Sequence, residues 1–328
     1  MSVDSRPLLD LPEHIGCADS IEGSVFTATH RLAESGLFTD EKLIELIDRT
    51  PRHLLGFTAM GTEPTQYAWS EGEFDHADGA MLLEAIKRGR FWLNVRKIME
   101  QAPDYARLVD AMYDELEEHC PGFVATRRSA NILISSPEAL VYYHVDVPQN
   151  ILWHVRGKKQ VFVYPDWRRD VDQATYEGIC DVVLSEDAPY KAEFDERAEV
   201  FDIEPGQWIT WPQNTPHRVT NVEGLNVSVS TEHYTPRALR HVRSIRANRT
   251  LRQLGLPTDS VPTKGVGYAV RHGVFVVKRL VEKYATKKAD FEYPRGFRLD
   301  LDKPGCMDPF DGVDPAEFGV ETDKPVEA

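Results

Sequence analysis

Residues 144–165 read HVDVPQNILWHVRGKKQVFVYP, and this stretch decides the fold that we predict. Two apolar runs, residues 151–155 and 160–164, flank Arg156-Gly157-Lys158, a pattern typical of two β-strands joined by a tight turn. His144 and Asp146 are two residues apart in a preceding apolar run, so in a strand their side chains point to the same side. The same alternation predicts that Tyr142 joins them on that side.

Strand-like runs recur over residues 129–235. Short stretches rich in Val, Ile, Tyr and Trp alternate with Pro, Gly and Asn turn signals. The eight runs are residues 131–135, 140–146, 151–155, 160–164, 199–203, 208–211, 217–220 and 225–233. This number of short strands with tight turns predicts a jelly roll. Residues 166–197 interrupt the series with acidic and polar residues, and we expect them to form a flexible rim over the barrel.

The flanking sequence predicts four regions. Residues 1–128 mix helical and extended patterns and should form an α/β region that packs on the core, which comprises residues 129–235. Residues 236–290 are helical in pattern, and residues 291–328 form a tail that is acidic and rich in Pro and Gly. The predicted fold class is therefore mainly β with flanking helices, a double-stranded β-helix core followed by C-terminal helices.

Composition argues against nucleic-acid binding and against a membrane protein. The chain has 38 basic and 53 acidic residues, a net charge of −15, which a phosphate lattice would repel. Arginines recur every three residues from Arg237 to Arg252, and we interpret them as a solvated helix face. No apolar run reaches bilayer length, and the first twenty residues lack the apolar core of a signal peptide. Four isolated cysteines fit a reducing compartment, so we expect a cytoplasmic protein.

Two imidazoles and one carboxylate on one face of a metal are the usual ligands of non-haem Fe(II) oxygenases. The strand residues His144 and Asp146 can supply two of these ligands, and the third must come from a distant strand. A second His-x-Asp triplet, formed by His76 and Asp78, lies in a polar, turn-like stretch beside Gly79. We therefore exclude the second triplet from the predicted site.

Two segments together resemble the jumonji-type (JmjC), cupin-like oxygenases, among them asparaginyl hydroxylases. One is residues 144–165, and the other is residues 204–217, EPGQWITWPQNTPH, in which a Pro-Gly turn starts a strand and a histidine follows the next turn. The resemblance covers about residues 129–234. It implies a cupin fold, Fe(II) bound by the catalytic residues His144, Asp146 and His217, and 2-oxoglutarate as co-substrate.

The resemblance also implies where 2-oxoglutarate binds. Lys159 occupies the family's lysine position, and an ammonium donor suits the far carboxylate of the co-substrate. Asn150 and Ser230 fall where relatives have polar residues near the co-substrate. Some relatives carry a hydroxyl residue three positions before the first ligand, where this chain has Val141, so we expect Tyr142 or an N-terminal residue to replace it.

These features predict an Fe(II)- and 2-oxoglutarate-dependent dioxygenase that hydroxylates a protein side chain or a small molecule. Relatives dimerise through C-terminal helices, which implies a homodimer here. Two alternatives stay open: a metal-dependent cupin that is not such an oxygenase, and a regulatory binding protein with a degenerate pocket. The absence of a His-x-His pattern near His144 weakens the first alternative, and the intact set of His144, Asp146, His217 and Lys159 weakens the second.

Overall fold

A computed structural model describes residues 6–11, 18–256, 258, 260–285 and 293–320. The strands are β1 (Leu9–Asp10), β2 (Phe26–His30), β3 (Leu55–Met60), β4 (Trp69–Glu73), β5 (Phe91–Val95), β6 (Thr126–Ser135), β7 (Leu140–His144), β8 (Gln149–Val163), β9 (Glu199–Ile203), β10 (Gln207–Thr210), β11 (His217–Tyr234), β12 (Arg295–Leu299) and β13 (Met307–Pro309). The helices are α1 (Ala18–Gly23), α2 (Asp40–Arg49), α3 (Gly79–Arg88), α4 (Ile98–Gln101), α5 (Pro103–His119), α6 (Gln173–Cys180), α7 (Pro236–Gln253) and α8 (Gly265–Ala285). Short 3-10 helices lie at Leu32–Ser35, Arg52–Leu54, Trp167–Arg169, Ala192–Arg197, Pro304–Cys306 and Pro315–Phe318.

The two longest strands, β8 and β11, form the spine of the barrel. They pair antiparallel from His217 opposite Val163 to His233 opposite Gln149, with register shifts near the middle. The shifts lie beside Gly157, whose φ of +79° favours glycine and where a Cβ atom would approach the Asn226 amide to 2.7 Å. The predicted turn at residues 156–158 is thus a bend within one continuous strand.

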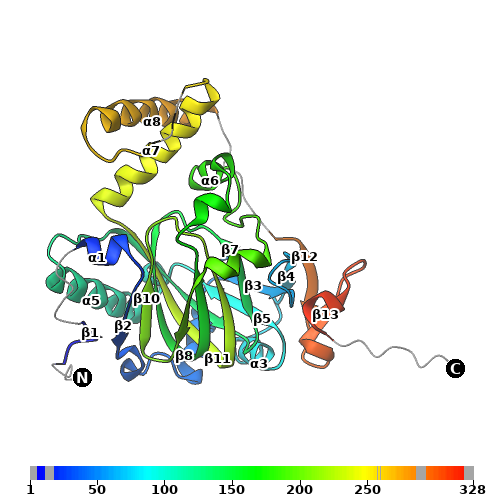
Figure 1. The fold of residues 1–328 in the computed structure, drawn as a ribbon. Coiled ribbons are helices and arrows are strands. Elements are labelled where there is room, and N and C mark those ends of the chain that lie inside the picture. The colour runs from blue at the N-terminus through cyan, green and yellow to red at the C-terminus, as the bar shows by residue number, and fades with distance from the viewer. Residues whose placement is uncertain (1–5, 12–17, 257, 259, 286–292, 321–328) are drawn as a thin grey trace.

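Each half of this spine pairs with different strands of one continuous sheet. The first half of β8 and the second half of β11 pair with β10 and β6, whereas the other halves pair with β9 and β7. Strands that change partners along their length in this way close the sheet into the double-stranded β-helix seen in Figure 1. The prediction of a mainly β fold with flanking helices is confirmed.

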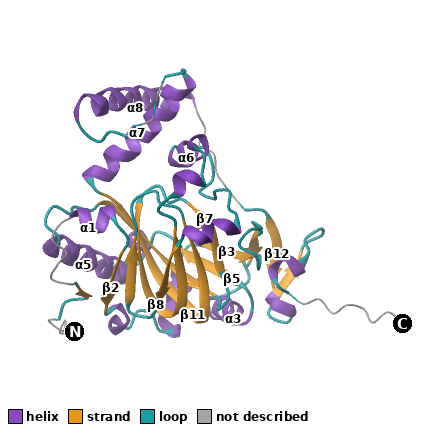
Figure 2. Cartoon of the chain, viewed as in Figure 1, coloured by secondary structure: helices purple, strands orange, loops and turns teal. Residues whose placement is uncertain are grey.

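The N-terminal region extends the barrel sheet instead of forming a separate layer. β5 pairs with β6, and β3, β4 and β12 continue the same sheet outward, while β2 pairs with β10 at the opposite side. One face of this extension packs on the main hydrophobic core, which includes Phe57, Phe91, Leu93 and residues of α2, α3 and α5. Figure 2 shows the helices flanking the continuous sheet.

The C-terminal part contains a helical pair and a return to the sheet. α7 packs against α8, and Figure 1 shows both beyond one end of the barrel, with α6 between them and the strands. We expected a tail from residue 291 onward, but β12 pairs parallel with β4, and β13 pairs with β12. Residues 321–328 of that tail lie outside the described part of the chain. None of the described helices is long and apolar enough to cross a membrane.

Candidate metal centre and active-site cavity

His144, Asp146 and His217 meet at one end of the barrel. His144 is the last residue of β7, Asp146 follows two residues later, and His217 begins β11 directly opposite His144. One potential ligand atom from each residue lies within 4.8 Å of the others. The Asp146 carboxylate oxygens are 3.6 Å from His144 Nε2 and 3.4 Å from His217 Nε2. The structure therefore brings together the three predicted metal ligands.

Hydrogen bonds on the far side of each ring orient the two histidines. His144 Nδ1 lies 2.7 Å from the Tyr142 carbonyl oxygen, and His217 Nδ1 lies 3.2 Å from the Thr215 carbonyl oxygen. A carbonyl can only accept, so each Nδ1 must carry the proton and donate. In the neutral rings both Nε2 atoms then have free lone pairs, which is the arrangement that a metal ion requires.

Asn150 and Ser230 hold the carboxylate in place. Asn150 Nδ2 donates to Asp146 Oδ2 at 3.0 Å and lies 3.1 Å from Ser230 Oγ. Both residues line the cavity beside the metal ligands, and Asn150 contacts the metal-binding carboxylate directly. We infer that Asn150 orients Asp146, whatever co-substrate lies nearby.

Burial shifts the protonation of this set. Desolvation, together with the nearby His144, lowers the pKa of His217 well below its ordinary value, so its ring is neutral near pH 7. Desolvation also raises the pKa of Asp146, against the opposing effects of His144 and the Asn150 hydrogen bond. An anionic carboxylate at this buried position lacks a full positive counter-charge, and a divalent cation would supply one.

The segment between β8 and β9 holds β7, the strand that carries His144, by backbone hydrogen bonds along the edge that does not pair with β11. Val145 N–H donates to the Glu186 carbonyl at 3.0 Å, Ala188 N–H donates to the Tyr143 carbonyl at 3.2 Å, and Asp187 forms a β-bridge with His144. We predicted a flexible rim here. Val182 and Leu184 do line the cavity, but residues 166–197 also contain α6 and contribute much of a buried cluster with Tyr143 and Ile245. The apolar residues of this segment that form the cluster are too widely spaced in the sequence to predict a helix or a strand.

Arg218 anchors the same segment from the barrel. Its guanidinium lies 3.4 Å from the centre of the Phe162 ring and donates to Asp195 Oδ2 at 2.5 Å. Tyr164 and Tyr190 also donate to Asp195 Oδ1, at 2.5 and 2.7 Å. Arg218 follows His217 directly in β11 and points to the opposite face, and these contacts give it a structural role.

The metal ligands lie in the wall of a cavity of about 670 Å³. Three further carboxylates line it, Glu186, Asp187 and Glu232, and none forms an ion pair with Lys or Arg in the described part of the chain. Desolvation and the neighbouring acids raise the pKa of Glu186 to about 8 and that of Glu232 to about 7. Near pH 7 the Glu186 carboxyl is therefore mostly protonated and the Glu232 carboxyl partly so, and a cationic group placed in the cavity would favour their ionised forms.

Sequence reasoning missed these three acids. Glu232 could have been found, because it lies two residues after Ser230 on the same face of β11. Glu186 and Asp187 could not, because their position depends on the path that residues 166–197 take back to β7.

Lys159 is not among the residues that line the cavity. It alternates with Val161 and Val163, whose side chains belong to the inner cluster with Leu152 and Trp211. Its side chain is buried, with a residue exposure of 5%, and makes no hydrogen bond or ion pair among the described residues. Desolvation lowers the pKa of its amine to about 7. A buried amine without a partner is suited to bind an anion.

Tyr142 is not brought to the cavity. Its hydroxyl accepts hydrogen bonds from Gly61 N–H at 3.0 Å and Ala68 N–H at 3.1 Å, so it points toward the N-terminal region. The cause is a bulge in β7, where the step from Val141 to His144 faces only the step from Val219 to His217. The bulge puts Val141, not Tyr142, on the cavity wall.

His154, His233 and the Asp78 of the second His-x-Asp triplet have structural partners. Asp78 caps α3 by accepting from Met81 N–H, so the second His-x-Asp triplet belongs to a helix start. His154 lies 3.0 Å from Ser228 Oγ, and His233 Nδ1 lies 3.1 Å from the Tyr113 hydroxyl. These contacts account for the burial of His154 and His233 without a metal ion.

No protein-family model matches this chain, and no curated protein matches it in sequence. Among solved structures, it is similar to YcfD from Escherichia coli, with 13% identity and a TM-score of 0.44 over 80% of this chain and 66% of that one. YcfD described as a ribosomal oxygenase in complex with cobalt and 2-oxoglutarate gives 14% identity and a TM-score of 0.41, over 75% of this chain and 60% of that one. The chain thus spans less than two thirds of the length of these structures.

A weaker similarity is to the DMSP lyase DddQ from Ruegeria pomeroyi. It has 8% identity and a TM-score of 0.22, and covers 33% of this chain and 38% of that one.

Proposed function

We propose that this protein is an Fe(II)- and 2-oxoglutarate-dependent oxygenase that hydroxylates a protein side chain or a small molecule. The observation that carries the proposal is the set of His144, Asp146 and His217, with ligand atoms within 4.8 Å of one another in the wall of a large cavity. Two histidines and one carboxylate are the ligand set typical of non-haem Fe(II) oxygenases, which leave metal positions open. Both Nε2 atoms are free to bind, because each Nδ1 donates elsewhere.

The remaining residues have distinct tasks in this proposal. Bound iron with 2-oxoglutarate and dioxygen would supply the oxidising chemistry. Lys159 would pair with the far carboxylate of 2-oxoglutarate, because it is a buried amine without an internal partner. Asn150 would hold Asp146 in its ligand orientation, with Ser230 supporting Asn150. Glu186, Asp187 and Glu232 would favour a cationic group on the substrate.

Two other functions are distinguishable from this one. A metal-dependent cupin of another class would bind the metal but not need 2-oxoglutarate, and a regulatory binding protein with a degenerate pocket would bind neither tightly. The buried, unpaired amine of Lys159 favours the oxygenase over these two alternatives. Burying an amine destabilises the fold unless a ligand pairs with it, and 2-oxoglutarate would be such a ligand.

Anaerobic calorimetry with Fe(II) and then 2-oxoglutarate tests the proposal. His217→Ala should weaken metal binding and abolish 2-oxoglutarate decarboxylation, because it removes a ligand. Lys159→Ala should leave Fe(II) affinity nearly unchanged and weaken 2-oxoglutarate binding at least a hundredfold, since breaking a buried pair costs on the order of 3–5 kcal/mol. Equal 2-oxoglutarate affinity in the parent and in Lys159→Ala would exclude this role of Lys159.

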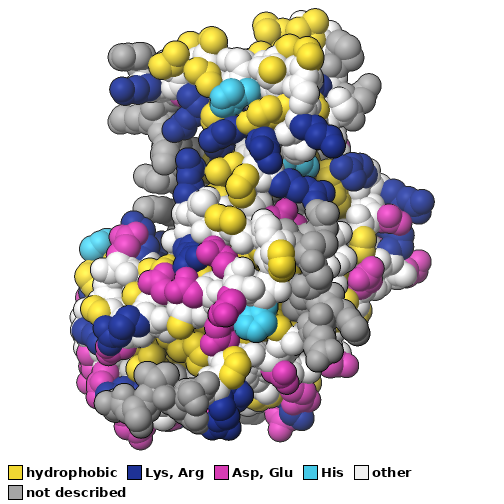
Figure 3. Space-filling view, turned by 90° about the vertical axis from the view of Figure 1, so that its left-hand side faces the viewer, with side chains coloured by type: hydrophobic (Ala, Val, Ile, Leu, Met, Phe, Trp, Pro, Cys, Tyr) yellow, Lys and Arg dark blue, Asp and Glu magenta, His cyan; other side chains and the backbone are white. Residues whose placement is uncertain are grey.

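We also propose a homodimer formed through the C-terminal helices. α8 exposes an apolar face, on which Val266 is 81%, Val277 62% and Val281 60% exposed. Figure 3 shows hydrophobic side chains gathered at the helical end of the molecule, next to a band of Lys and Arg. Several arginines of α7 are engaged within the chain, for example Arg249 with Asp181 and Arg252 with Glu177. This internal pairing supports a protein contact over a nucleic-acid contact.

The oligomeric state can be measured by light scattering. A double substitution, Val277→Asp with Val281→Asp, should convert dimers to monomers, because it places two charges in the apolar face. Val124→Asp is the matched control, since Val124 is 48% exposed but lies before β6, away from these helices. A parent chain that is monomeric at micromolar concentration would contradict the proposal.

We place the protein in the cytoplasm. The three described cysteines, Cys120, Cys180 and Cys306, are buried and free, which is compatible with a reducing compartment.

A further inference from the structure

The inner face of the barrel continues beyond the barrel wall. Ser230 on β11 and Leu133 on β6 line the metal cavity, and the next strand, β5, contributes Trp92 and Asn94 to the same cavity. Asn94 pairs in register with Leu133 on one side and Gly56 on the other, so the face runs on to β3 and then β4. On β5 and β3 the intervening side chains, such as Phe57 and Leu93, point to the core.

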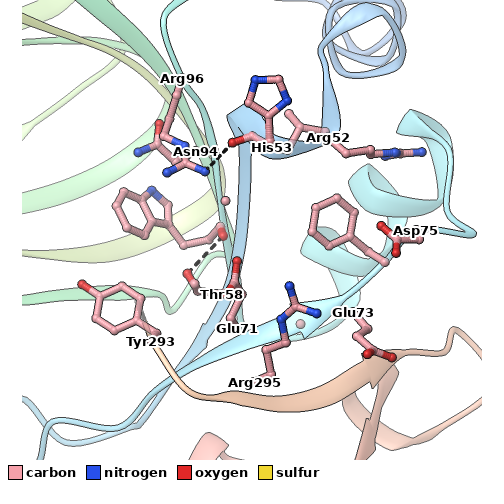
Figure 4. Close-up of a pocket in the computed structure, with 15 residues that line it drawn as sticks. Arg52, His53, Thr58, Glu71, Glu73, Asp75, Asn94, Arg96, Tyr293 and Arg295 are labelled. Atoms are coloured by element: carbon pink, nitrogen blue, oxygen red, sulfur yellow. Dashed lines mark hydrogen bonds between the residues drawn. The ribbon is translucent and has the colours of Figure 1, made fainter. Parts of the chain in front are cut away.

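A second cavity of about 420 Å³ lies over this extension (Figure 4). It shares Trp92, Asn94 and Tyr293 with the metal cavity, so the two cavities are adjacent on this face of the sheet. Trp69 forms the aromatic boundary with them, with its ring 5.2 Å from that of Tyr293 and 5.6 Å from that of Trp92. We refer to the two cavities together as the sheet groove.

Polar groups without internal partners line the second cavity. Asn94 Oδ1 is buried and accepts no hydrogen bond, and the side chains of Glu71 and Arg295 form no hydrogen bond or ion pair within the described residues. Figure 4 shows the Arg295 guanidinium and the Glu71 carboxylate pointing into the cavity from adjacent strands. Unpaired donors and acceptors on an open face are suited to bind the polar groups of a ligand.

The charge of the second cavity selects the class of ligand. Its lining combines basic with acidic side chains, and the two kinds are balanced: Arg52, Arg96 and Arg295 against Glu71, Glu73 and Asp75. A nucleic acid requires an excess of Lys and Arg to neutralise phosphates, which this cavity lacks. A polypeptide offers amide groups and side chains of both signs, which match such a surface.

The length of the sheet groove selects the size of the ligand. From β11 to β12 there are five strand intervals, in the order β11-β6-β5-β3-β4-β12. At about 4.8 Å per interval this is roughly 24 Å. An extended chain rises about 3.4 Å per residue, so the groove matches a segment of about seven residues. The metal cavity alone would already hold a small metabolite.

We propose that the substrate is a polypeptide, of which a segment of about seven residues crosses β5, β3 and β4 along the sheet groove while one side chain enters the metal cavity. This inference rests on the proposed function, and it narrows the substrate class from protein or small molecule to protein. Recognition uses side chains on the face of the sheet, because the segment runs across the strands and not along an edge.

A selection from a random dodecapeptide display library, against the full chain with Mn(II) and 2-oxoglutarate, supplies the probes. Selected peptides are synthesised with a fluorescent label, and their Kd is measured by anisotropy. We expect Glu71→Lys or Arg295→Glu to weaken binding about tenfold or more, because each reverses a charge that faces the peptide. Glu100→Lys is the matched control, since Glu100 is exposed on α4 and lines neither cavity. Truncating a peptide to four residues should weaken binding by a similar factor.

Three results would overturn the inference. The first is that the selected peptides bind both groove variants as tightly as the parent chain. The second is that four-residue fragments bind as tightly as the full peptides. The third is that a 20-nucleotide RNA binds more tightly than any selected peptide and loses affinity in the Arg295→Glu variant. Mn(II) affinity is measured separately by calorimetry, and the selection is repeated without metal. If the parent chain does not bind Mn(II) but peptides still bind and respond to the groove variants, the proposed function alone is refuted. If the parent chain binds Mn(II) tightly but no selected peptide responds to the groove variants, the inference alone is refuted.

Discussion

Lys159→Met isolates the consequence of burying an amine without a partner. Desolvation lowers the pKa of Lys159 from 10.5 to about 7. A pKa change of one corresponds to 1.36 kcal/mol, so the charged amine is destabilised by on the order of 5 kcal/mol relative to water. Methionine has a similar length, no charge, and apolar neighbours in Val161 and Val163. We therefore expect the variant to be more stable than the parent when no co-substrate is present.

The size of this gain should depend on pH. The unfolded chain keeps the lysine proton up to about pH 10.5, whereas the folded chain loses it above about pH 7. Between these values the unfolded state binds more protons, so the stability of the parent rises with pH by up to about 1.4 kcal/mol per unit. The advantage of Lys159→Met is therefore largest, at most about 5 kcal/mol, below pH 7. It should fall to about 2 kcal/mol by pH 9.

Urea unfolding at pH 6 and pH 9, with EDTA present, measures both values. Repeating the unfolding with Mn(II) and saturating 2-oxoglutarate should reverse the order, because only the parent can pair with the far carboxylate. Val161→Met, a neutral change in the same cluster, controls for altered packing. A stability difference that is the same at both pH values would refute the reasoning, as would equal stabilisation of both proteins by 2-oxoglutarate.

Three further substitutions, with Ser230→Ala as the control for the first, test the surroundings of the site. Asn150→Leu should weaken Mn(II) binding in calorimetry by about 10- to 100-fold, since it removes the hydrogen bond to Asp146, whereas Ser230→Ala should change it far less. Asp195→Asn should lower the free energy of unfolding at pH 7 by about 2 kcal/mol. Although burial opposes it, hydrogen bonds from Arg218 and two tyrosines lower the pKa of Asp195, so this loss should vanish in acid, once the parent carboxyl is protonated. Asp181→Asn should destabilise the chain by on the order of 3 kcal/mol in urea, because its buried carboxylate pairs with two cations; an unchanged midpoint would contradict this.

Short-range pattern in the sequence was sufficient to predict the barrel strands and two of the metal ligands, because alternation places His144 and Asp146 on one side of a strand. The third ligand, His217, was predicted from the resemblance of residues 204–217 to the jumonji-type oxygenases. The same alternation failed for Tyr142, because the bulge between Val141 and His144 changes which side chains face inward. A bulge of this kind depends on the partner strand and has no reliable local signal.

Long-range pairing accounts for the features that were not predicted. β12 lies parallel to β4, although more than two hundred residues separate them, so the tail that carries Tyr293 and Arg295 could not be assigned to the sheet groove. The segment 166–197 reads as polar, yet Tyr176 and Ile179 are buried against α7, whose own position is equally non-local. Such contacts arise from tertiary packing and not from periodicity.

The segment 166–197 has one more consequence, because it touches the metal centre at one end and the helical pair at the other. Asp187 bridges to His144, while Asp181 and Glu177 pair with Lys278, Arg249 and Arg252. Anything that orders α7 and α8, including self-association, should therefore also order the ligand strand. By thermodynamic linkage the effect is reciprocal, so that metal would promote assembly by the same factor as assembly promotes metal binding. The fraction of chains carrying iron would then rise with the concentration of the protein itself.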